Sequence, residues 1–392
     1  MVINIKDFGA AETNDDNAAY IQKAIDNAEK GDTVFIPAGI FLCSTIYLKS
    51  NITLYFGDGA VLKATTDIAR YKNIYNVENG KPFVDSFGMG INSFIICSNA
   101  ENVTFEGNGI IDLSGNDMLD YSITDEDVKK FGDKVNQIPA RPNERIRRPI
   151  FFDKCTNIRV KNIKVINSPC WTFTFNNCRD LKVLGITVEN NVRTPHSDGV
   201  HISGSTDAII DNCNFTCGDD CIALTSLMDD TKVCKNIIIS NCIMQSSSAA
   251  IRIGHISGKV ESVIVSNICI HNTNRGIAVF AGDGGFVKNV SIANVIMDTY
   301  IPAGGWWGKG EPFVICSANS SGLIENVKIV NMNATSENIG LVAGNVENFE
   351  LCDSKINIID GENRIYAKEF DIAPNGKLLK QNDFCGEYYL EK

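Results

Sequence analysis

The stretch TNIRVKNIKVINSPCWTFTFNNCRDLKVLGITVENN, residues 156–191, contains two copies of one short pattern. The copies begin with TNIRV at residue 156 and RDLKV at residue 179, and both alternate apolar and polar residues as a half-buried β-strand does. A second short strand pattern follows each copy, as in VINSPCWTFTF. The stretch therefore predicts a unit of short strands that repeats along the chain.

The same pattern recurs along most of the sequence. Further copies are ENVTF at 101, TDAII at 206, KNIII at 235, ESVIV at 261, KNVSI at 288, ENVKI at 325 and ENFEL at 347. Between residues 156 and 288 successive copies are 23 to 29 residues apart. Repeats of this length, with almost no helical periodicity between them, predict an all-β parallel solenoid. Its turns would stack at ~4.8 Å and share one apolar interior.

The remaining segments fit one solenoid domain over residues 1–392. Residues 15–31 have the apolar spacing of a helix, with Gly31 as its stop, and we expect this helix to cover the open N-terminal end of the interior. Residues 114–149 interrupt the repeat with a charged stretch, which predicts a long surface loop. The Asn and Cys residues that recur in the repeats are expected to form ladders inside the solenoid.

Composition narrows the class of protein. The formal net charge of −11 argues against binding to nucleic acid or to anionic membranes through a general positive field. The N-terminus has no apolar segment behind a basic start, and no apolar run approaches the ~18 residues of a membrane span, so a cytoplasmic location is expected. The 14 cysteines are then expected to be reduced. Their spacing does not match a metal site, and we expect no metal and no cofactor.

Acidic residues gather in the stretch HSDGVHISGSTDAIIDNCNFTCGDDCIAL, residues 196–224. Asp198 and Asp219 are 21 residues apart, about one turn, and Asp220 follows directly. Carboxyl groups brought together in this way raise one another's pKa, which leaves a protonated acid beside an ionised base. Paired carboxyl groups are the usual equipment for glycoside hydrolysis. The alternative interpretation is that these aspartates lie in solvated turns.

Three stretches carry a resemblance to a known family. They are VINIKDFGAAETNDDNAAYIQKAI at the start, RRPIFFDKCTNIRVKNIKVINSPCWTFTFNNC in the middle, and SDGVHISGSTDAIIDNCNFTCGDDCIAL, which is similar to the NTDG and GDDC motifs. Over nearly its whole length the chain resembles glycoside hydrolase family 28, the polygalacturonases and their relatives. The resemblance implies a right-handed parallel β-helix and hydrolysis with inversion. It implies Asp219 as general acid, with Asp198 and Asp220 activating the water. The ~4.8 Å between turns is closer to the carboxyl separation of retaining enzymes, but this spacing fixes only the backbones and side chains can splay, so inversion remains the expectation.

The chain departs from the family pattern where that family binds galacturonate. Ala249 stands in place of the histidine of a GHG motif, and Ala278 and Phe280 stand in place of the cations of an Arg-Ile-Lys pattern. A charge-assisted contact to a carboxylate is worth ~1.5–3 kcal/mol, so we expect weak activity on polygalacturonate.

Other side chains are candidates for binding the sugar. Arg252 lies among residues suited to burial, His201 is three residues after Asp198, and adjacent tryptophans in the glycine-rich segment GGWWGKGEP could stack on sugar rings. Lys309 and Glu311 in that segment could contact substrate or form a surface pair. The substrate-binding candidates are His196, His201, Arg252, His255, Arg275, Trp306, Trp307, Lys309 and Glu311.

Together these features predict a glycoside hydrolase that releases units from the end of an oligosaccharide, with a pectin fragment as one candidate. Its partner would be the oligosaccharide substrate, with no nucleic acid or membrane partner. Two alternatives are a β-helix glycosidase or glycosyl-transfer enzyme for a neutral sugar, and a carbohydrate-binding solenoid without catalysis. A pectate lyase would require calcium sites and a basic residue for proton abstraction.

Overall fold

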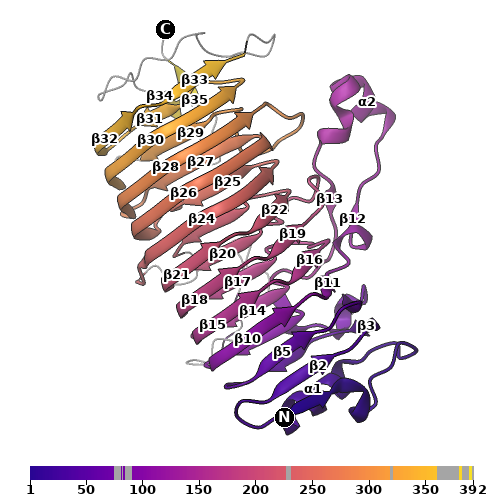
Figure 1. Cartoon of the computed structure of the whole chain (residues 1–392). Helices are drawn as coiled ribbons and strands as arrows, with labels where there is room; N and C mark the ends of the chain where they lie inside the picture. Colours follow the sequence, from indigo (N-terminus) through magenta and orange to yellow (C-terminus); the bar gives the residue numbers. More distant parts are fainter. Residues whose placement is uncertain are drawn as a thin grey trace.

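The structure is a computed structural model that describes residues 1–74, 81, 83, 91–226, 231–317, 321–359, 379–381 and 388–390. Strands stack in successive turns along one axis, with the N-terminus at one end (Figure 1). The protein is a right-handed parallel β-helix, which confirms the predicted solenoid. No helix in these segments is long and apolar enough to cross a membrane.

Two parallel sheets form the solenoid. The smaller one has ten strands: β4 (Ile46–Leu48), β9 (Ile95–Ser98), β14 (Ile150–Asp153), β17 (Phe173–Asn176), β20 (Val200–Ser203), β23 (Ile222–Thr225), β25 (Ala249–Ile253), β27 (Arg275–Ala281), β29 (Phe313–Ser317) and β31 (Leu341–Ala343). We call it the ten-stranded sheet.

The larger sheet has 19 strands and forms the rest of the solenoid's surface. They are β1 (Val2–Asn4), β2 (Thr33–Ile36), β3 (Gly39–Cys43), β5 (Thr53–Phe56), β6 (Ala60–Ala64), β10 (Glu101–Gly107), β11 (Ile110–Asp112), β15 (Thr156–Lys161), β16 (Lys164–Ile166), β18 (Arg179–Leu184), β19 (Thr187–Glu189), β21 (Thr206–Asp211), β22 (Asn214–Cys217), β24 (Cys234–Ser246), β26 (Lys259–Thr273), β28 (Phe286–Thr299), β30 (Leu323–Ser336), β32 (Val346–Cys352) and β33 (Lys355–Ile358). Three short antiparallel pairs lie outside both sheets: β7 (Lys72–Asn73) with β8 (Asn92–Ser93), β12 (Leu119–Asp120) with β13 (Arg141–Pro142), and β34 (Leu379–Gln381) with β35 (Tyr388–Leu390).

Apolar side chains at matching positions of successive turns fill the interior. In the ten-stranded sheet one such row runs through Ile150, Phe173, Val200, Ile222, Ile251, Ile277 and Phe313, and all of them are fully buried. Stacked rings add specific contacts, since the rings of Phe152 and Phe175 are 4.9 Å apart and 14° from parallel. Burial of such rows at ~25 cal/mol per Å² is the main force that holds the turns together.

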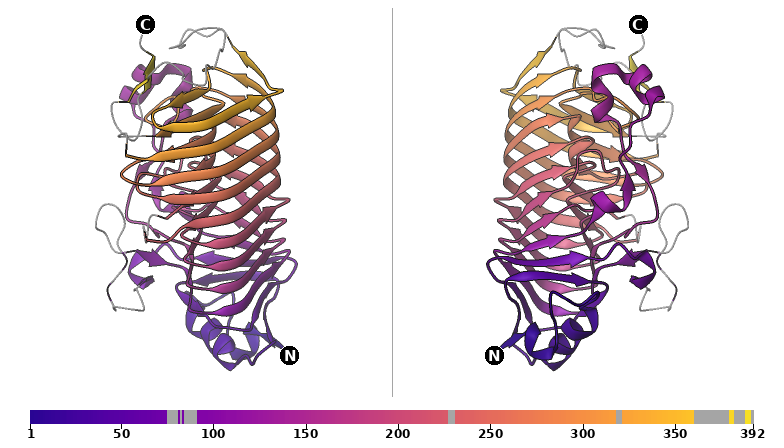
Figure 2. Two further views of the ribbon diagram at one scale, coloured as in Figure 1. Left: turned by 90° about the vertical axis from the view of Figure 1, so that its left-hand side faces the viewer. Right: turned by 90° about the vertical axis from the view of Figure 1, so that its right-hand side faces the viewer.

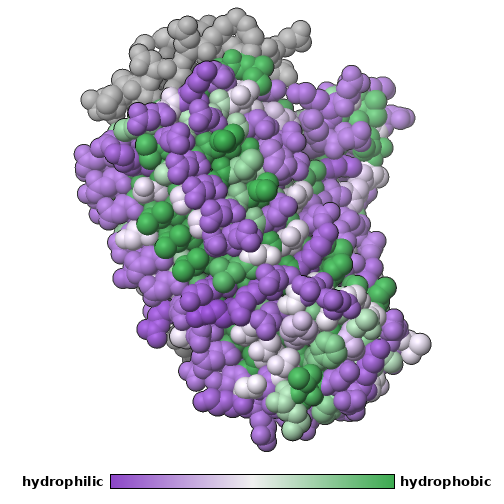
Figure 3. Space-filling view, viewed as in Figure 1, coloured by the Kyte–Doolittle hydropathy of each residue, from purple (hydrophilic) through white to green (hydrophobic). Residues whose placement is uncertain are grey.

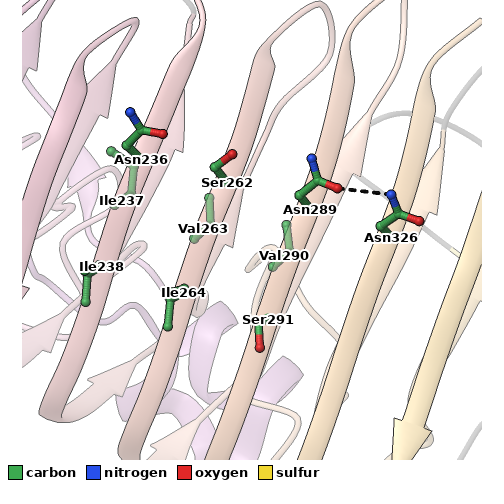
Figure 4. Close-up of a pocket in the computed structure, with 10 residues that line it drawn as sticks. All are labelled: Asn236, Ile237, Ile238, Ser262, Val263, Ile264, Asn289, Val290, Ser291 and Asn326. Carbon is green, nitrogen blue, oxygen red and sulfur yellow. Dashed lines mark hydrogen bonds between the residues drawn. The ribbon is translucent and has the colours of Figure 1, made fainter.

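The recurrent asparagines form ladders on the outside of the solenoid. Each copy of the repeat has its second residue in the left-handed region, as at Asn289 (φ 56°) and Asn326 (φ 57°). The side-chain amide of Asn326 donates to Asn289 across 3.0 Å (Figure 4). Asparagine tolerates this backbone conformation, and exposed amides such as those of Asn326 and Asn294 then bond to the preceding turn. The prediction that the asparagine ladder is internal was therefore wrong.

Most of the recurrent cysteines do lie inside. Of the 13 described cysteines all are free, 11 are buried, Cys352 is half-buried and Cys269 is exposed. The Sγ atoms of Cys97 and Cys155 are 3.7 Å apart in one such column. These side chains fill the corners of the interior as small apolar groups.

Helix α1 (Ala18–Asn27) covers the N-terminal end of the interior, as expected, but is shorter than the predicted 15–31. Its buried residues Ile21, Ala24 and Ile25 belong to the same apolar cluster as the first strands. The carboxylate of Asp16 accepts from the backbone N–H of Ala18 at the helix start. The chain leaves the helix at Ala28, which has extended backbone angles.

The interruption at residues 114–149 is more ordered than the predicted surface loop. It contains the helix α2 (Asp125–Phe131), which lies beside the later turns of the solenoid (Figures 1 and 2). The hydroxyl of Thr124 and the carboxylate of Asp127 each bond to the other residue's backbone N–H, which is a capping box. That motif is present in the sequence, and it stabilises a helix start without any apolar spacing. We call residues 114–149 the insertion.

The outer face of the larger sheet carries hydrophobic residues among hydrophilic ones (Figure 3), and Ile238, Ile243, Ile264 and Ile296 on its strands are exposed. Ile238 and Ile264 are register partners on β24 and β26, with 38% and 49% of their surface exposed, and they line the shallow depression drawn in Figure 4. This face lies on the larger sheet, whereas the aspartates of residues 196–224 lie at the ten-stranded sheet.

Candidate active site

The three aspartates come together at the starts of β20 and β23. Val200 pairs with Ile222 in the register of these strands. Asp198 and Asp220 each stand two residues before these partners, so they lie beside each other on adjacent turns. The backbone N–H of Gly199 donates to the carbonyl oxygen of Asp220 across 2.9 Å, so the ladder continues to this point. Asp219 directly precedes Asp220. The solenoid therefore collects the carboxylates on adjacent turns, as the 21-residue spacing predicted.

The three carboxyl groups differ in how much of their surface is exposed, and this difference limits the role that each can take. Asp198 and Asp220 each have 1% of their surface exposed, whereas Asp219 is half-buried. Within this trio only Asp219 is open to a group arriving from outside. The backbone N–H of His196 and the hydroxyl of Ser248 both contact the Asp219 carboxylate and hold it in place.

Burial raises the pKa of all three aspartates. For Asp198 desolvation is the largest cause, and the charges of Asp219 and Asp220 raise its pKa further. Desolvation also raises the pKa of Asp219. It raises the pKa of Asp220 to about 6, although the positive charge of Arg252 opposes the shift. Three close carboxyl groups that share one cation will retain a proton near neutral pH.

Arg252 is the cation of this cluster. It lies on β25, where it is the register partner of Ala223, and its Nε donates a hydrogen bond to Oδ2 of Asp220. Its Nη2 lies 4.0 Å from Oδ2 of Asp198. From the sequence, Arg252 was predicted to bind substrate. The structure places its guanidinium on the aspartates, so its first role is to hold two of the carboxylates.

His201 lies on the outer face of β20 and is fully buried. Its Nδ1 is 2.8 Å from Oδ2 of Asp198 and its Nε2 is 2.9 Å from Oγ1 of Thr225. Burial and the charge of Arg252 lower the His201 pKa well below its usual value. A neutral imidazole therefore bonds to Asp198, and His201 orients that carboxylate rather than contacting substrate as predicted.

Trp171 and Arg148 extend this group and were missed by the sequence analysis. The Trp171 ring stacks on the His201 ring, with centroids 3.6 Å apart and 14° from parallel. The Arg148 guanidinium lies 3.4 Å from the centre of the Trp171 ring. Both residues stand two positions before a strand of the ten-stranded sheet, as Asp198 and Asp220 do. That shared position is the sequence signal that could have identified them.

Arg275 and Glu311 form a buried ion pair. Nε and Nη2 of Arg275 donate to the two carboxylate oxygens of Glu311 across 3.2 and 3.0 Å. Neither side chain has more than 4% of its surface exposed. The Arg275 guanidinium also lies 4.4 Å from the centre of the Trp307 ring. The predicted substrate contacts of Arg275 and Glu311 are thus replaced by a structural pair, and the possible Lys309–Glu311 surface pair is not formed.

The two tryptophans of the loop between β28 and β29, residues 300–312, have different surroundings. We call this segment the Trp307 loop. Trp306 is buried, and its Nε1 donates to the carbonyl oxygen of Gln137 in the insertion across 2.7 Å. It therefore joins two segments and does not offer a ring face to a sugar as predicted. Trp307 is half-buried and packs on Phe280, with ring centroids 5.1 Å apart.

The remaining candidates lie around the aspartates. His196 is exposed and has a left-handed backbone (φ 63°), which turns its N–H toward Asp219. His255 is half-buried, and burial with the charge of Arg252 lowers its pKa to about 3. Lys309 is half-buried, and its backbone N–H donates to Glu311. Within the described part of the chain, no group of His, Cys, Asp and Glu side chains has the arrangement of a metal site.

Comparison with known proteins identifies the family. The family model described as glycosyl hydrolases family 28 matches residues 32–353. The chain belongs to this family. A probable polygalacturonase of Vitis vinifera is 27% identical over 284 residues, which cover 69% of this chain and 54% of that protein. An endo-polygalacturonase of Pectobacterium parmentieri is 25% identical over 337 residues, covering 84% of this chain and 79% of its own length.

Among solved structures, an exopolygalacturonase from Thermotoga maritima shares the fold with a TM-score of 0.67 and 21% sequence identity. The superposition covers 91% of this chain and 87% of that one. The chain spans 54% of the length of the Vitis vinifera relative, so that protein contains further sequence.

This member of glycosyl hydrolases family 28 has an apolar cluster at the positions where the sequence lacks the family's polar residues. Ala249, Ala278 and Phe280 are fully buried, and they pack with Val314, Cys316 and Leu341. Ala278 and Val314 continue the row of outer-face residues that contains Arg252. Trp307 lies against this cluster. The sheet face next to Arg252 is therefore apolar and covered by the Trp307 loop.

Proposed function

We propose that this family 28 protein hydrolyses a glycosidic bond of an oligosaccharide with inversion. Asp219 would donate its proton to the oxygen of the leaving sugar, and Asp198 with Asp220 would activate the water. The observation that carries the proposal is the exposure of Asp219 alone above two buried carboxyl groups. A proton donor must reach the glycosidic oxygen, whereas the base needs only a path for one water molecule.

Arg252 and His201 contact the two carboxylates that would activate the water. Arg252 lowers the pKa of Asp220, so that this carboxyl group is ionised above about pH 6. His201 bonds to Asp198 and fixes the direction of its second oxygen. A charged carboxylate in a buried setting is costly unless it is paired, and the Arg252 guanidinium offsets that cost. Burial raises the pKa of Asp198 as well as that of Asp219, and we assign the transferred proton to Asp219 because it is the more exposed of the two carboxyl groups.

The position of the Trp307 loop supports action at chain ends. This loop packs on the outer face of β27, one strand after Arg252, and it bonds to the insertion through Gln137. The Ser248 hydroxyl contacts Asp219 and lies 3.3 Å from the carbonyl oxygen of Trp307. A polysaccharide crossing the aspartates would meet the loop within about one turn of ~4.8 Å. We therefore expect the terminal sugar to be bound against the loop.

The surroundings of the aspartates also support weak activity on polygalacturonate. The described face beyond Arg252 is formed by Ala278, Phe280 and Val314, and the guanidinium of Arg275 is already bonded to Glu311. A galacturonate carboxylate placed there would lose its hydration without gaining a charged partner. We expect kcat/KM on polygalacturonate to be lower by several powers of ten than on a preferred substrate.

The experiment is time-resolved proton NMR of the wild-type protein with a panel of acidic, neutral and mixed oligosaccharides. The expected result is hydrolysis of at least one member, with the anomer opposite to the substrate formed first and a single sugar unit as the first product. A carbohydrate-binding solenoid would give no product from any member. Initial formation of the retained anomer would contradict the assignment of a water-activating pair.

A further inference from the structure

Thr225 lies one turn after His201 and contacts its ring. It stands on β23 two residues after Ala223, the register partner of His201, and its side chain is fully buried. Its Oγ1 lies 2.9 Å from Nε2 of His201, which is the one hydrogen-bond contact of this hydroxyl group among the described residues. A hydroxyl group has one hydrogen to donate and needs an acceptor for it when it is buried. The acceptor available to Thr225 is therefore the imidazole nitrogen.

Two arrangements of hydrogen atoms fit the contacts of a neutral His201 ring. In the first, Thr225 donates to Nε2, while Nδ1 carries the ring hydrogen and donates to Oδ2 of Asp198 across 2.8 Å. In the second, Asp198 is protonated on Oδ2 and donates to Nδ1, while Nε2–H donates to Thr225. The second arrangement leaves the buried Thr225 hydroxyl without an acceptor in the described part of the chain, which costs free energy. The first arrangement satisfies all three groups.

The surroundings of His201 keep its ring neutral and hold its plane. Burial lowers the pKa of His201, and the positive charges of Arg252 and Arg148 lower it further, with a smaller contribution from His255. The Trp171 ring stacks on the imidazole at 3.6 Å between centroids. An imidazolium ion would donate at both nitrogens, and these charges disfavour it. The ring therefore accepts at one nitrogen and donates at the other.

The hydrogen on Nδ1 bears on the ionisation of Asp198. Burial raises the pKa of Asp198, and the charges of Asp219 and Asp220 and the nearby Cys170 raise it further, whereas Arg252 lowers it. A neutral N–H donor stabilises the ionised carboxylate without bringing a second positive charge to the cluster. Oδ1 of Asp198 is buried and has no hydrogen-bond partner within the described segments, so this oxygen remains to accept from a water molecule.

We propose that Thr225 is a positioning residue for the hydrolysis: it fixes the Nδ1–H tautomer of His201 and thereby keeps Asp198 an ionised acceptor. The proton that the carboxyl cluster retains is then excluded from Asp198. This inference rests on the proposed function, in which Asp198 activates the water and Asp219 is the acid. Thr225 acts through His201 and does not itself contact the substrate.

The first test is nitrogen-15 NMR of the wild-type protein labelled at histidine. The chain has four histidines, and the signals of His201 are those that disappear in His201→Asn. The chemical shifts of the two ring nitrogens show which of them carries the hydrogen. Between about pH 5 and 8, where an ordinary histidine titrates, His201 should stay neutral with its hydrogen on Nδ1. A hydrogen on Nε2, or an imidazolium ion in this range, would overturn the proposal.

The second test compares two variants of Thr225 with a matched control. Thr225→Val lacks the hydroxyl group, so the Nε2–H form should gain population, and kcat should fall on the order of 10-fold with KM little changed. Thr225→Ser retains the hydroxyl group and should keep the wild-type tautomer and most of the activity. The control is Thr174→Val, which should change neither. Thr174 is the register partner of His201 on β17, is fully buried, and has no hydrogen-bond partner for its hydroxyl group among the residues described.

The pH profile separates a positioning role from a purely structural one. Loss of the Thr225 hydroxyl weakens the donor to Asp198, so the pKa of Asp198 should rise and the acidic limb of kcat/KM should move to higher pH. A structural defect would lower the rate at every pH and leave the limb unmoved. An unmoved limb in Thr225→Val, or an equal loss of activity in Thr225→Ser, would refute the role of Thr225.

These measurements separate the inference from the proposed function. The tautomer is observed without turnover. If the wild-type protein hydrolyses no oligosaccharide, the proposed hydrolysis fails, and the NMR signals still decide which nitrogen of His201 carries the hydrogen. If the protein hydrolyses an oligosaccharide while His201 carries its hydrogen on Nε2, the hydrolysis stands and the inference about Thr225 fails.

Discussion

The Nε of Arg252 donates a hydrogen bond to Oδ2 of Asp220, and this contact crosses from β25 to the start of β23. Arg252 is the largest favourable influence on the ionised form of Asp220, while desolvation and the charge of Asp219 act against it. The positive charge of one guanidinium group thus acts on three carboxyl groups. The balance between these charges sets the pH at which the cluster can work as acid and base together.

Removal of the Arg252 charge should move the acidic limb of the pH profile. In the wild-type protein Asp220 has a pKa of about 6, so kcat/KM should fall as the pH drops below about 6. Arg252→Gln removes a charge that lowers this pKa, and the limb should therefore shift to higher pH. Arg252→Lys retains the charge and should shift it less. The measurement is kcat/KM between pH 4 and 9 on one oligosaccharide, and an unmoved limb in Arg252→Gln would refute this account of Asp220.

Asp198→Asn should stabilise the fold most strongly at high pH. The pKa of Asp198 is raised in the folded chain, so its contribution to stability is fully present below the unfolded value of ~4 and is lost as the pH rises. An asparagine has no charge to desolvate. The melting temperature of the variant should exceed that of the wild type by about 3 °C or more at pH 8, and by less at pH 4. A difference that does not change with pH would contradict the direction of this shift.

The external asparagine ladder gives a prediction about backbone strain. Asn294 has φ 56°, donates to Asn267 across 3.0 Å and accepts from Asn331 across 2.9 Å. Asn294→Gly and Asn294→Ala both lose these bonds, but alanine also pays ~1–2 kcal/mol for the left-handed backbone. Thermal unfolding should therefore give a lower melting temperature for the alanine variant. Equal values for the two variants would show that the strain is relieved elsewhere.

The cysteines should titrate as thiols. The 13 described cysteines are free, and most of them fill the interior. Denatured, non-reduced protein that was purified without oxidant should react with a thiol reagent at nearly all of its 14 cysteines. A majority of unreactive cysteines would indicate disulfides, and it would also contradict the expected cytoplasmic location.

The fold could be predicted because the same sequence pattern repeats in successive turns. Each turn encodes its strands by alternation and its bend by an asparagine, so a single period of the sequence predicts the stack. The asparagines were nevertheless predicted to lie inside the solenoid, whereas they lie outside. Alternation shows which residues share a face, but the polar turn residues lie at the bends, where their left-handed backbone keeps them outside. The capping box of α2 is visible in the sequence, although the charged composition of the insertion favours a loop.

The sequence predicts which site residues lie on neighbouring turns. It predicts less well which side chains form ion pairs or stack on one another. The 21-residue spacing of Asp198 and Asp219 predicts that the three aspartates lie on neighbouring turns. Arg275 and Glu311 stand at equivalent positions of two successive turns, two residues before the partners Ile277 and Phe313, but the Trp307 loop separates them by 36 positions and hides this relationship in the sequence. The stack of Arg148, Trp171 and His201 depends on ring orientations that a sequence does not contain. Long-range contacts of this kind decide which cations remain available to a substrate.

Turnover and binding in Asp219→Asn test directly whether Asp219 donates the proton. The amide is close in size and shape to the carboxyl group, so the fold and the affinity for oligosaccharide should remain. The rate of hydrolysis of the best oligosaccharide in the panel should fall ~10²–10⁴-fold, as is typical for the loss of a positioned general acid. A folded Asp219→Asn protein that binds and hydrolyses the oligosaccharide at the wild-type rate would show that Asp219 is not the proton donor.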